Sequence, residues 1–302
     1  MLTATVVVSC YNQENYIEEC LDSILGQDIN FPCEVIVSDD CSPDNTQAVI
    51  RRYAEAHPGR LTLMLRDKNV GAALNYHGVH AMAKGDIVFH FDGDDVMLPG
   101  KLQEQYDLFV AHPDVNIVFH KAIYFSDDRS YQSMTVYPGE QAPYHTFFDL
   151  HQLARWGATC VHSSYAYRRS SRQAKIEREF MEWFFAMDAL IRGGRGVYIN
   201  KALVMYRSNP GNGSYLSTLN GRKKSYTIFF GDLFQYFADH PRLRSDLYAN
   251  FLITALAMLR STRTLSVKNF KFLLRNIAYF RPAKFFETAR IRKMVGPAQK
   301  NR

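Results

Sequence analysis

The sequence predicts an α/β fold with a mostly parallel central sheet flanked by helices, followed by a helical C-terminal extension. Short apolar and β-branched runs, which suit buried strands, alternate with amphipathic helical segments at the spacing of βαβ units. The chain has 302 residues, of which 47% are hydrophobic and 22% charged, and this composition excludes a disordered or fibrous class. Because the balance of charge changes sign after residue 220, we expect a first domain over 1–220, with halves at 1–120 and 121–220, and a basic helical region over 221–302.

The first half is regular, because strands and helices alternate along it. Strands are expected at 5–10, 34–38, 61–66, 87–91 and 115–119, with helices at about 17–25, 43–57, 72–84 and 99–111. Asn15 and Glu18 match the N-cap and N3 positions of a capping box before the first helix. Ser42 followed by Pro43 matches an N-cap with proline at the first position of the second helix.

The second half is less regular. A polar, turn-rich stretch at 126–143 suits an excursion or hairpin. The elements expected after it are a helix at 147–156, a strand at 159–167, a helix containing Trp183 and short strands at 197–199 and 203–207. Four C-terminal helices are expected at 226–238, 245–260, 267–280 and 283–294.

Positive charge is concentrated at the C-terminus. The net charge is +6, but residues 221–302 hold 17 Lys and Arg against 4 Asp and Glu, a net charge of +13, which leaves −7 for residues 1–220. Basic amphipathic helices with aromatic residues suit an anionic membrane surface, and no nucleic acid partner is expected. The alternatives are a solvated face, a bundle packed on the first domain, or a homodimer formed through these helices.

The cysteines and the termini bear on location. The five cysteines are odd in number and show no CxxC or CxxH spacing, so neither a disulfide framework nor a zinc site is expected, which favours a reducing compartment. No signal sequence and no apolar run of the roughly 20 residues that cross a bilayer is evident. We therefore expect a cytoplasmic protein, with peripheral attachment to the inner face of the cytoplasmic membrane as the option that the basic helices add.

Negative charge is concentrated at the end of the strand expected at 87–91. Asp92, Asp94 and Asp95 follow this strand, and Gly93 allows a tight turn between them. In open α/β sheets, ligands bind at the C-terminal edge of the strands, and clustered carboxylates there repel one another unless they share a divalent cation. The sequence therefore predicts a metal and diphosphate site. The alternative is an acidic turn solvated at the surface.

A second pair of acids, Asp39 and Asp40, closes the strand expected at 34–38. The turn after the first strand, 9–13, has no glycine fingerprint and the chain has no Walker lysine. This pattern predicts that a nucleotide is bound through carboxylates and a metal and not through a glycine-rich loop.

Four motifs, in order over about 95 residues, resemble those of the family 2 glycosyltransferases of the GT-A fold. They are Tyr11–Asn12, Asp39–Asp40, Asn69-Val70-Gly71 with Asn75, and Asp92-Gly93-Asp94-Asp95 with Pro99. The resemblance implies that Asp39 accepts from the nucleobase, that Ser9 and Tyr11 line the base and ribose pocket, and that Asp94 is the first choice of direct metal ligand. The implied donor site comprises Ser9, Tyr11, Asn12, Asp39, Asp40, Asn69, Gly71, Asn75, Asp92, Gly93 and Arg207, and the implied metal ligands are Asp94, Asp92 and Asp95, with Mn²⁺ or Mg²⁺ as the cofactor.

The family carries an acidic residue before a tryptophan, 11 residues ahead of a glycine, and Glu182 stands at this distance from Gly193. The resemblance implies that Glu182 is the general base, with Glu179 as the runner-up. The alternative is a carboxylate favoured by the dipole of a helix N-terminus. His162 could face the acceptor, although a lone histidine in a strand is more often structural.

Arg207 ends a stretch, 203–207, that resembles the family's closing Tyr-Arg motif. The family often has a histidine two residues later, where this chain has Asn209, and the flexible stretch 210–214 could close over a diphosphate. Arg207 could contact phosphate, or it could serve only as a structural ion-pair partner.

The sequence as a whole predicts a metal-dependent, inverting glycosyltransferase. It would move a sugar from a nucleotide-diphosphate donor, with UDP-sugars as the first candidates, to a hydroxyl of a glycan or lipid-linked saccharide in cell-surface polysaccharide biosynthesis. The alternative is a catalytically silent GT-A domain that binds nucleotide or glycan and organises a biosynthetic complex.

Overall fold

A computed structural model describes residues 1–129, 132–134, 143–157, 160–173, 176, 178–208 and 218–294. The strands are β1 (Ala4–Cys10), β2 (Cys33–Asp39), β3 (Thr62–Leu65), β4 (Ile87–Asp92), β5 (Val96–Met97), β6 (Val115–Phe125), β7 (Gln132–Met134), β8 (His145–Phe148), β9 (Ala166–Arg168) and β10 (Arg195–Arg207). The helices are α1 (Ile17–Leu25), α2 (Thr46–Ala56), α3 (Ala72–Met82), α4 (Lys101–Ala111), α5 (Leu150–Trp156), α6 (Glu182–Asp188), α7 (Leu219–Asp239), α8 (Arg244–Thr262), α9 (Val267–Arg275) and α10 (Pro282–Met294).

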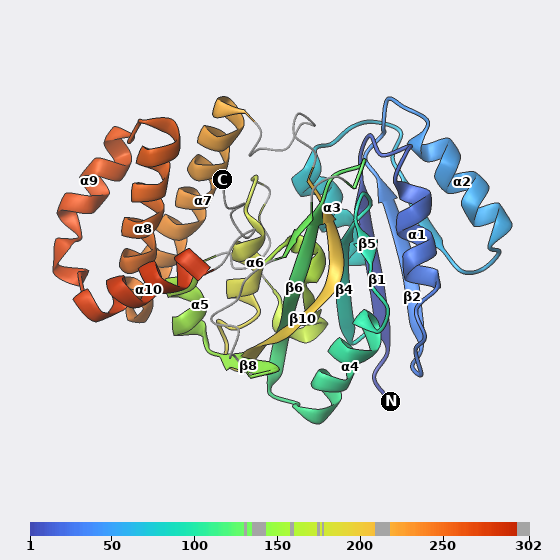
Figure 1. Ribbon diagram of the computed structural model, residues 1–302, viewed down its shortest axis with the longest axis horizontal. Helices are drawn as coiled ribbons and strands as arrows, with labels where there is room; N and C mark the ends of the chain where they lie inside the picture. Colours follow the sequence, from blue (N-terminus) through green and yellow to red (C-terminus); the bar gives the residue numbers. More distant parts are fainter. Residues whose placement is uncertain are drawn as a thin grey trace.

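The described strands form one sheet at the centre of the molecule (Figure 1). Its order is β3-β2-β1-β4-β9-β6-β10-β5, with β7 paired to β6 and β8 paired to β10. The strands β3, β2, β1 and β4 are parallel, as the sequence predicts, whereas β9 runs antiparallel between β4 and β6. The first half of the sheet is thus parallel and the second half is mixed.

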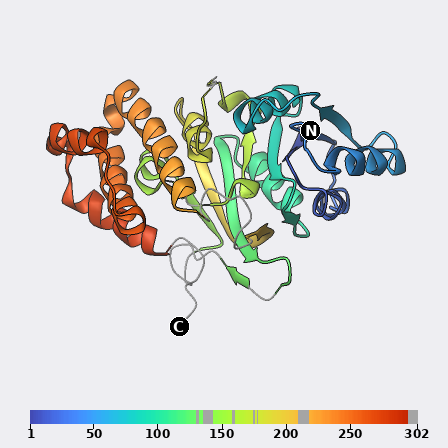
Figure 2. The ribbon, with the colours of Figure 1, turned by 90° about the horizontal axis from the view of Figure 1, so that it is seen from above.

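Helices cover both faces of the sheet, because successive strand residues point to opposite sides. Val6 and Val8 of β1 pack in one core with α1, α2 and α4, whereas Val7 packs in a second core with α3, α5 and α6. The second core continues into α7 and α8. Seen from above, the C-terminal helices lie at one end of the molecule, and α1 and α2 lie at the other (Figure 2).

Two predicted helix caps are wrong. The helix α1 begins at Ile17 without the capping box of Asn15 and Glu18, and the carbonyl of Gln13 accepts the first backbone bonds. The helix α2 begins at Thr46, because Ser42 is engaged in a turn with Asp39. Local propensity does not decide these starts, since the turns that precede both helices are shaped by contacts between strand ends.

Four predicted elements in the second half also differ. The stretch 147–156 is divided between β8 and α5, because 145–148 pairs with β10. Of the strand expected at 159–167, the described residues 160–165 are not in a strand; β9 spans Ala166–Arg168, and a 3₁₀ turn at His162–Ser164 precedes it. The two short strands expected at 197–199 and 203–207 form one strand, β10, with shifts of register against β6.

A buried carboxylate ties the C-terminal helices to the rest of the chain. Asp246 of α8 is fully buried and accepts from His151 and Arg155 of α5, both at 2.8 Å, and it pairs with Lys284 of α10 at 2.8 Å. Although burial opposes it, the hydrogen bonds from Lys284, His151 and Arg155 lower the pKa of Asp246. The ionised carboxylate therefore joins three helices.

We expect Asp246→Ala to lower the free energy of unfolding by about 3–5 kcal/mol, because it leaves Arg155 and Lys284 without their buried partner. In the parent protein this contribution is present above the pKa of an unfolded aspartate and is lost as the pH falls through the lowered pKa of the folded state. Urea unfolding at several pH values measures both effects. The exposed Asp239 provides a control, and Asp239→Ala should change stability by less than about 0.5 kcal/mol.

Candidate active site

Neighbouring parallel strands end side by side at one edge of the sheet. In the register of the sheet, Ser9 of β1 lies beside Ser38 of β2 and beside Asp92 of β4. The backbone N–H of Gly93 donates to the carbonyl of Ser9 at 3.0 Å. The structure thus brings the polar strand ends together, as the sequence predicts, while the chemical role of each residue stays a prediction.

Asp39 is fully buried, and its own turn takes up its carboxylate. It accepts from the backbone N–H of Ser42 at 2.9 Å, from the hydroxyl of Ser42, and from Nε2 of Gln47 at 2.8 Å. The hydroxyl of Ser42 in turn accepts the backbone N–H of Asn12 at 2.8 Å. Ser42 therefore links the ends of β1 and β2.

Asp40 shapes the turn that carries Asn69 and Gly71. Its carboxylate accepts the backbone N–H groups of Val70 at 2.9 Å and Gly71 at 2.8 Å, and its carbonyl accepts Nδ2 of Asn69 at 3.0 Å. Gly71 has φ +90, which a side chain would strain. These three predicted donor-site residues are therefore held together as one unit.

Among the other predicted donor-site residues, one is buried and two are exposed to solvent. Asn75 is buried and donates to the hydroxyl of Ser9 at 3.3 Å, while its oxygen accepts the hydroxyl of Ser38 at 2.5 Å. Tyr11 and Asn12 are exposed. Asn75 therefore acts as a tie between strand ends, and Tyr11 and Asn12 offer the surface that a ligand could touch.

Gly93 is required by a close approach. A Cβ atom at this position would lie 2.4 Å from Oε1 of Gln13 and 2.8 Å from Cβ of Cys10. Its φ is not in the left-handed region. The glycine therefore lets the acidic turn pack directly against the end of β1.

The carboxylates of the acidic turn, Asp92–Asp95, repel one another. Burial, followed by the neighbouring Asp92 carboxylate, raises the pKa of Asp94 to about 6. Burial, followed by Asp94 and Asp92, raises the pKa of Asp95 well above its usual range. Carboxylate oxygens are the ligands that Mg²⁺ and Mn²⁺ prefer, and a bound cation would relieve this repulsion. The residues present therefore fit a divalent cation.

Asp95 differs from its two neighbours because it is fully buried. One of its oxygens accepts the backbone N–H of Arg207 at 2.9 Å, and the other has no hydrogen-bond partner in the described part of the chain. The buried ammonium of Lys101 lies over the rings of Phe89 and Phe91, at 5.5 and 5.4 Å from their centroids. Burial lowers the pKa of Lys101 to about 7, and the charge of Asp95 acts against this shift. The buried position of Asp95 suits a residue that holds the turn in place. Asp94 and Asp92 are therefore the better candidates for direct contact with a metal.

The guanidinium of Arg207 is engaged on three sides. It donates to the carbonyl of Asp94 at 2.7 Å, to Asp127 at 2.6 Å and to Glu19 at 2.8 Å. Its side chain is 6% exposed and lies over the ring of Tyr16, 4.3 Å from the centroid. These contacts fit a structural ion-pair role for Arg207 better than a role in binding phosphate, because the guanidinium already binds the backbone of the acidic turn and two carboxylates.

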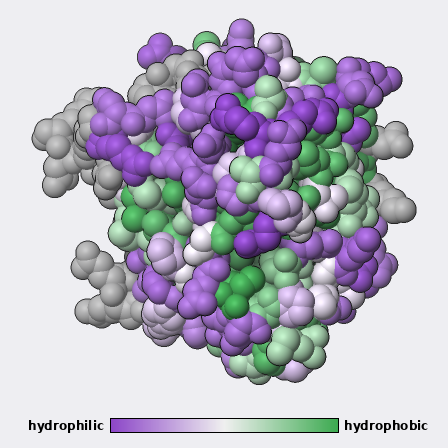
Figure 3. Space-filling model, turned by 90° about the vertical axis from the view of Figure 1, so that its right-hand side faces the viewer, coloured by the Kyte–Doolittle hydropathy of each residue, from purple (hydrophilic) through white to green (hydrophobic). Residues whose placement is uncertain are grey.

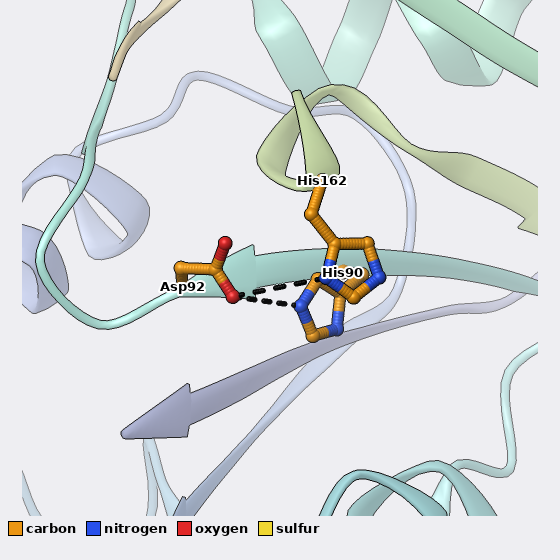
Figure 4. Close-up of side chains that lie close together, drawn as sticks. All are labelled: His90, Asp92 and His162. Carbon is orange, nitrogen blue, oxygen red and sulfur yellow. Dashed lines mark hydrogen bonds and ion pairs between the residues drawn. The ribbon is translucent and has the colours of Figure 1, made fainter. Parts of the chain in front are cut away.

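Two histidines border the carboxylate of Asp92 (Figure 4). Nε2 of His90 lies 3.0 Å from Oδ1 of Asp92, and Nδ1 of His162 lies 3.9 Å from the same oxygen. Within the described residues, these three side chains are the cluster whose ligand atoms converge. However, the two rings stack 3.6 Å apart at 24°, so they share no in-plane point at the roughly 2.1 Å of a metal–nitrogen bond. The pair therefore does not suit joint ligation of one ion.

The histidines instead form a hydrogen-bonded chain that ends on Asp92. Tyr167 bonds to Nδ1 of His80 at 2.5 Å, Nε2 of His80 to Nδ1 of His90 at 3.0 Å, and Nε2 of His90 to Asp92. Burial lowers the pKa of His80 well below its usual range, so this ring is neutral. Because His80 accepts from Tyr167 at Nδ1, its Nε2–H donates to Nδ1 of His90, and the N–H at Nε2 of His90 then donates to Oδ1 of Asp92. Against the effect of burial, this bond lowers the pKa of Asp92.

Glu182 begins α6 and is half-buried. Burial raises its pKa to about 7, with the carboxylates of Asp92 and Asp232 acting in the same direction. Glu182 therefore lies within electrostatic reach of the acidic turn. Glu179, in contrast, is half exposed and paired with Lys224 at 2.5 Å, so Glu182 is better suited to take up a proton near neutral pH.

The start of α6 is fixed from two sides. The fully buried Trp183 donates from Nε1 to the carbonyl of Leu153 at 3.1 Å. Asp232 of α7 accepts the backbone N–H of Met181 at 2.8 Å and also the guanidinium of Arg178. A helix of the C-terminal region thereby sets the position of Glu182.

Sequence reasoning missed the supporting residues His80, His90, Tyr167 and Lys101. His90 alone carried a signal, because a histidine inside an otherwise apolar strand needs a polar partner. Several predictions fall outside the described residues: those on Asn209, on the stretch 210–214, and on most of the excursion at 126–143 beyond Arg129.

A family model described as Glycosyl transferase family 2 matches residues 5–174. An uncharacterized protein of Mycobacterium tuberculosis is 30% identical over 224 residues, which are 73% of this chain and 62% of that protein. The chain thus matches somewhat less than two thirds of the length of this relative.

Two solved structures share the fold. S. aureus TarS 1-349 in complex with UDP has a TM-score of 0.60 at 18% identity, covering 96% of this chain and 89% of that one. The mannosyltransferase PcManGT from Pyrobaculum calidifontis, in complex with GDP-Man and Mn²⁺, has a TM-score of 0.56 at 23% identity, covering 97% and 85%.

We expect His90→Phe to weaken Mn²⁺ binding by about 10- to 100-fold, because it removes the donor that orients Asp92. His90→Gln should retain most of the affinity, since the amide nitrogen of glutamine can replace Nε2 as the donor. Isothermal titration of the full chain with Mn²⁺ measures both, with His112→Phe, at the residue that follows α4, as a control. An equal loss in the Phe and Gln variants would contradict an orienting role for this bond.

Proposed function

We propose, from the premise that the chain belongs to glycosyl transferase family 2, that it transfers a sugar from a nucleotide-diphosphate donor to an acceptor hydroxyl, with inversion at the anomeric carbon and dependence on a divalent cation. The observation that carries this proposal is the meeting of Ser9, Asp39–Asp40 and the acidic turn Asp92–Asp95 at one edge of the sheet. The fold is GT-A, as the sequence predicts and as the family match and the likeness to solved structures show.

When bound, a divalent cation would offset the charge that develops on the departing diphosphate. Asp94 and Asp92 are proposed to hold it, because both residues are partly exposed whereas Asp95 is fully buried. Arg207 and Asp95 fix the turn from the buried side. The chain's own contribution is thus to keep the carboxylates close together before the donor arrives.

The donor is proposed to be a UDP-sugar, with a GDP-sugar as the second choice. The first is supported by the TarS complex with UDP, and the second by the PcManGT complex with GDP-Man and Mn²⁺. Tyr11, Asn12 and Asn69 are the exposed residues of the predicted donor site, so they are proposed to contact the nucleoside. Asp39 could accept from the base only if its bonds to Ser42 and Gln47 are shared or rearranged.

Glu182 is proposed to be the general base. Inverting transfer requires a carboxylate that removes the proton of the acceptor hydroxyl as its oxygen attacks the anomeric carbon. The raised pKa and the position of Glu182 within electrostatic reach of Asp92 support this role. The acceptor is proposed to be a hydroxyl of a glycan or lipid-linked saccharide in cell-surface polysaccharide biosynthesis, at the cytoplasmic face of the membrane.

The proposal is tested by following the release of nucleoside diphosphate from UDP-GlcNAc and GDP-Man, with Mn²⁺ or with a chelator, against a panel of saccharide acceptors. We expect Mn²⁺-dependent release that Asp94→Ala abolishes, while Asp67→Ala, a change at an exposed acid outside the turn, leaves it intact. Intact nucleotide binding without turnover on any donor would instead favour the silent binding domain.

We expect Glu182→Gln to lower transfer by at least roughly a hundredfold with little change in donor affinity. In the parent enzyme kcat/KM should rise as the pH rises through about 7, because only the ionised form of Glu182 can accept the proton. The Gln variant should lose this limb of the pH profile. Glu179→Gln serves as the matched control, and a loss of activity there but not at position 182 would move the role to Glu179.

A further inference from the structure

The helix α9 exposes apolar side chains although it also has an apolar buried side. Its inner side packs Phe272 and Leu273 against the second core. On its outer side, Val267, Phe270 and Leu274 are 71%, 52% and 57% exposed. They are spaced i, i+3 and i+7, so they form one stripe along the helix. A surface helix in water normally carries polar residues on this side.

The apolar surface extends beyond α9 into the segments that follow it. Ile277 and Phe280 are 60% and 36% exposed, and Phe286 on α10 is 68% exposed. The ring of Phe285 links the last two, at 6.0 Å from Phe280 and 5.5 Å from Phe286. We call these six residues, Val267, Phe270, Leu274, Ile277, Phe280 and Phe286, the α9 face. Exposed apolar residues gathered in this way mark an interaction surface.

The charge around the α9 face has one sign. Residues 247–286 contain no Asp or Glu, but they contain seven Lys and Arg. Lys268, Lys271 and Arg275 are exposed on α9 itself, and in the described part of the chain no ion pair neutralises Lys271 or Arg275. The partner must therefore accept apolar side chains and also carry negative charge.

A second copy of the chain fits these requirements poorly. A two-fold contact would place the same basic residues of both copies against each other, and the surrounding 40-residue stretch offers no carboxylate to pair with them. An anionic lipid bilayer offers both features, since its acyl region takes the apolar side chains and its headgroups take the flanking Lys and Arg.

We propose that the α9 face docks this protein on an anionic membrane surface. The face lies at the end of the molecule opposite α1 and α2 (Figure 1). That opposite end is seen in Figure 3, where hydrophilic residues are interspersed with hydrophobic ones. Docking through α9 leaves the edge that carries the acidic turn away from the contact helix, and α7 connects the two regions through Asp232 and the start of α6. The inference does not depend on the proposed function, because it concerns binding alone.

The test is co-sedimentation of the full chain with vesicles of pure phosphatidylcholine and with vesicles in which about a third of the lipid is phosphatidylglycerol. We expect binding to the second kind only, weakened by salt at about 1 M. Lys268→Gln, Lys271→Gln and Arg275→Gln together should lower partitioning by about 100-fold. Phe270→Ser with Leu274→Ser should lower it by about tenfold or more.

Matched controls separate a specific face from net charge alone. Arg51→Gln, Arg60→Gln and Lys84→Gln remove the same charge from exposed positions in the first half of the chain, and Val110→Ser removes an exposed apolar residue of α4. Both controls should bind as the parent does. Equal binding to both kinds of vesicle, no binding, or an equal loss in the charge control would overturn the proposal. So would a dimer in light scattering that Phe270→Ser with Leu274→Ser converts to a monomer without any vesicle binding by the parent.

Discussion

The repulsion among three carboxylates at the end of β4 is the constraint on which the rest of the site depends. Asp92, Asp94 and Asp95 lie within four positions in a largely buried turn, where burial and the neighbouring carboxylates raise the pKa of Asp94 and of Asp95. The surrounding contacts keep the turn in place: Gly93 allows its close approach to β1, and Arg207 binds its backbone. The repulsion that remains is the feature that favours a divalent cation.

The second half of the sheet and the C-terminal helices are part of the same arrangement. The strand β10 delivers Arg207 to the acidic turn, and β9 places Tyr167 at the far end of the hydrogen-bonded chain to Asp92. The helix α7 holds the segment before Glu182 through Asp232. Residues 221–294 therefore do more than extend the fold, because they fix one of the two carboxylate groups that the proposed reaction needs.

The uneven distribution of charge gives the two regions of the chain different surface chemistry. The acidic excess of residues 1–220 includes the turn that suits a cation, whereas the basic excess of residues 221–302 surrounds an exposed apolar stripe on α9. If lipid carries the acceptor, docking through α9 would raise the local concentration of acceptor without any contact to the acidic turn. Catalysis and attachment would then use separate surfaces and could be altered separately.

The sequence by itself determined the parallel first half of the sheet, the acids at its strand ends and the helical C-terminus, because apolar periodicity and short motifs are local signals. Only the tertiary structure decided the roles of the supporting residues. Ser42 binds Asp39 and does not cap the helix as predicted. His80, His90 and Tyr167 are in contact because α3, β4 and β9 pack together. The partners of Arg207 lie 80 to 188 residues away in the chain. Such contacts leave no periodic trace in the sequence, so no local pattern could have predicted them.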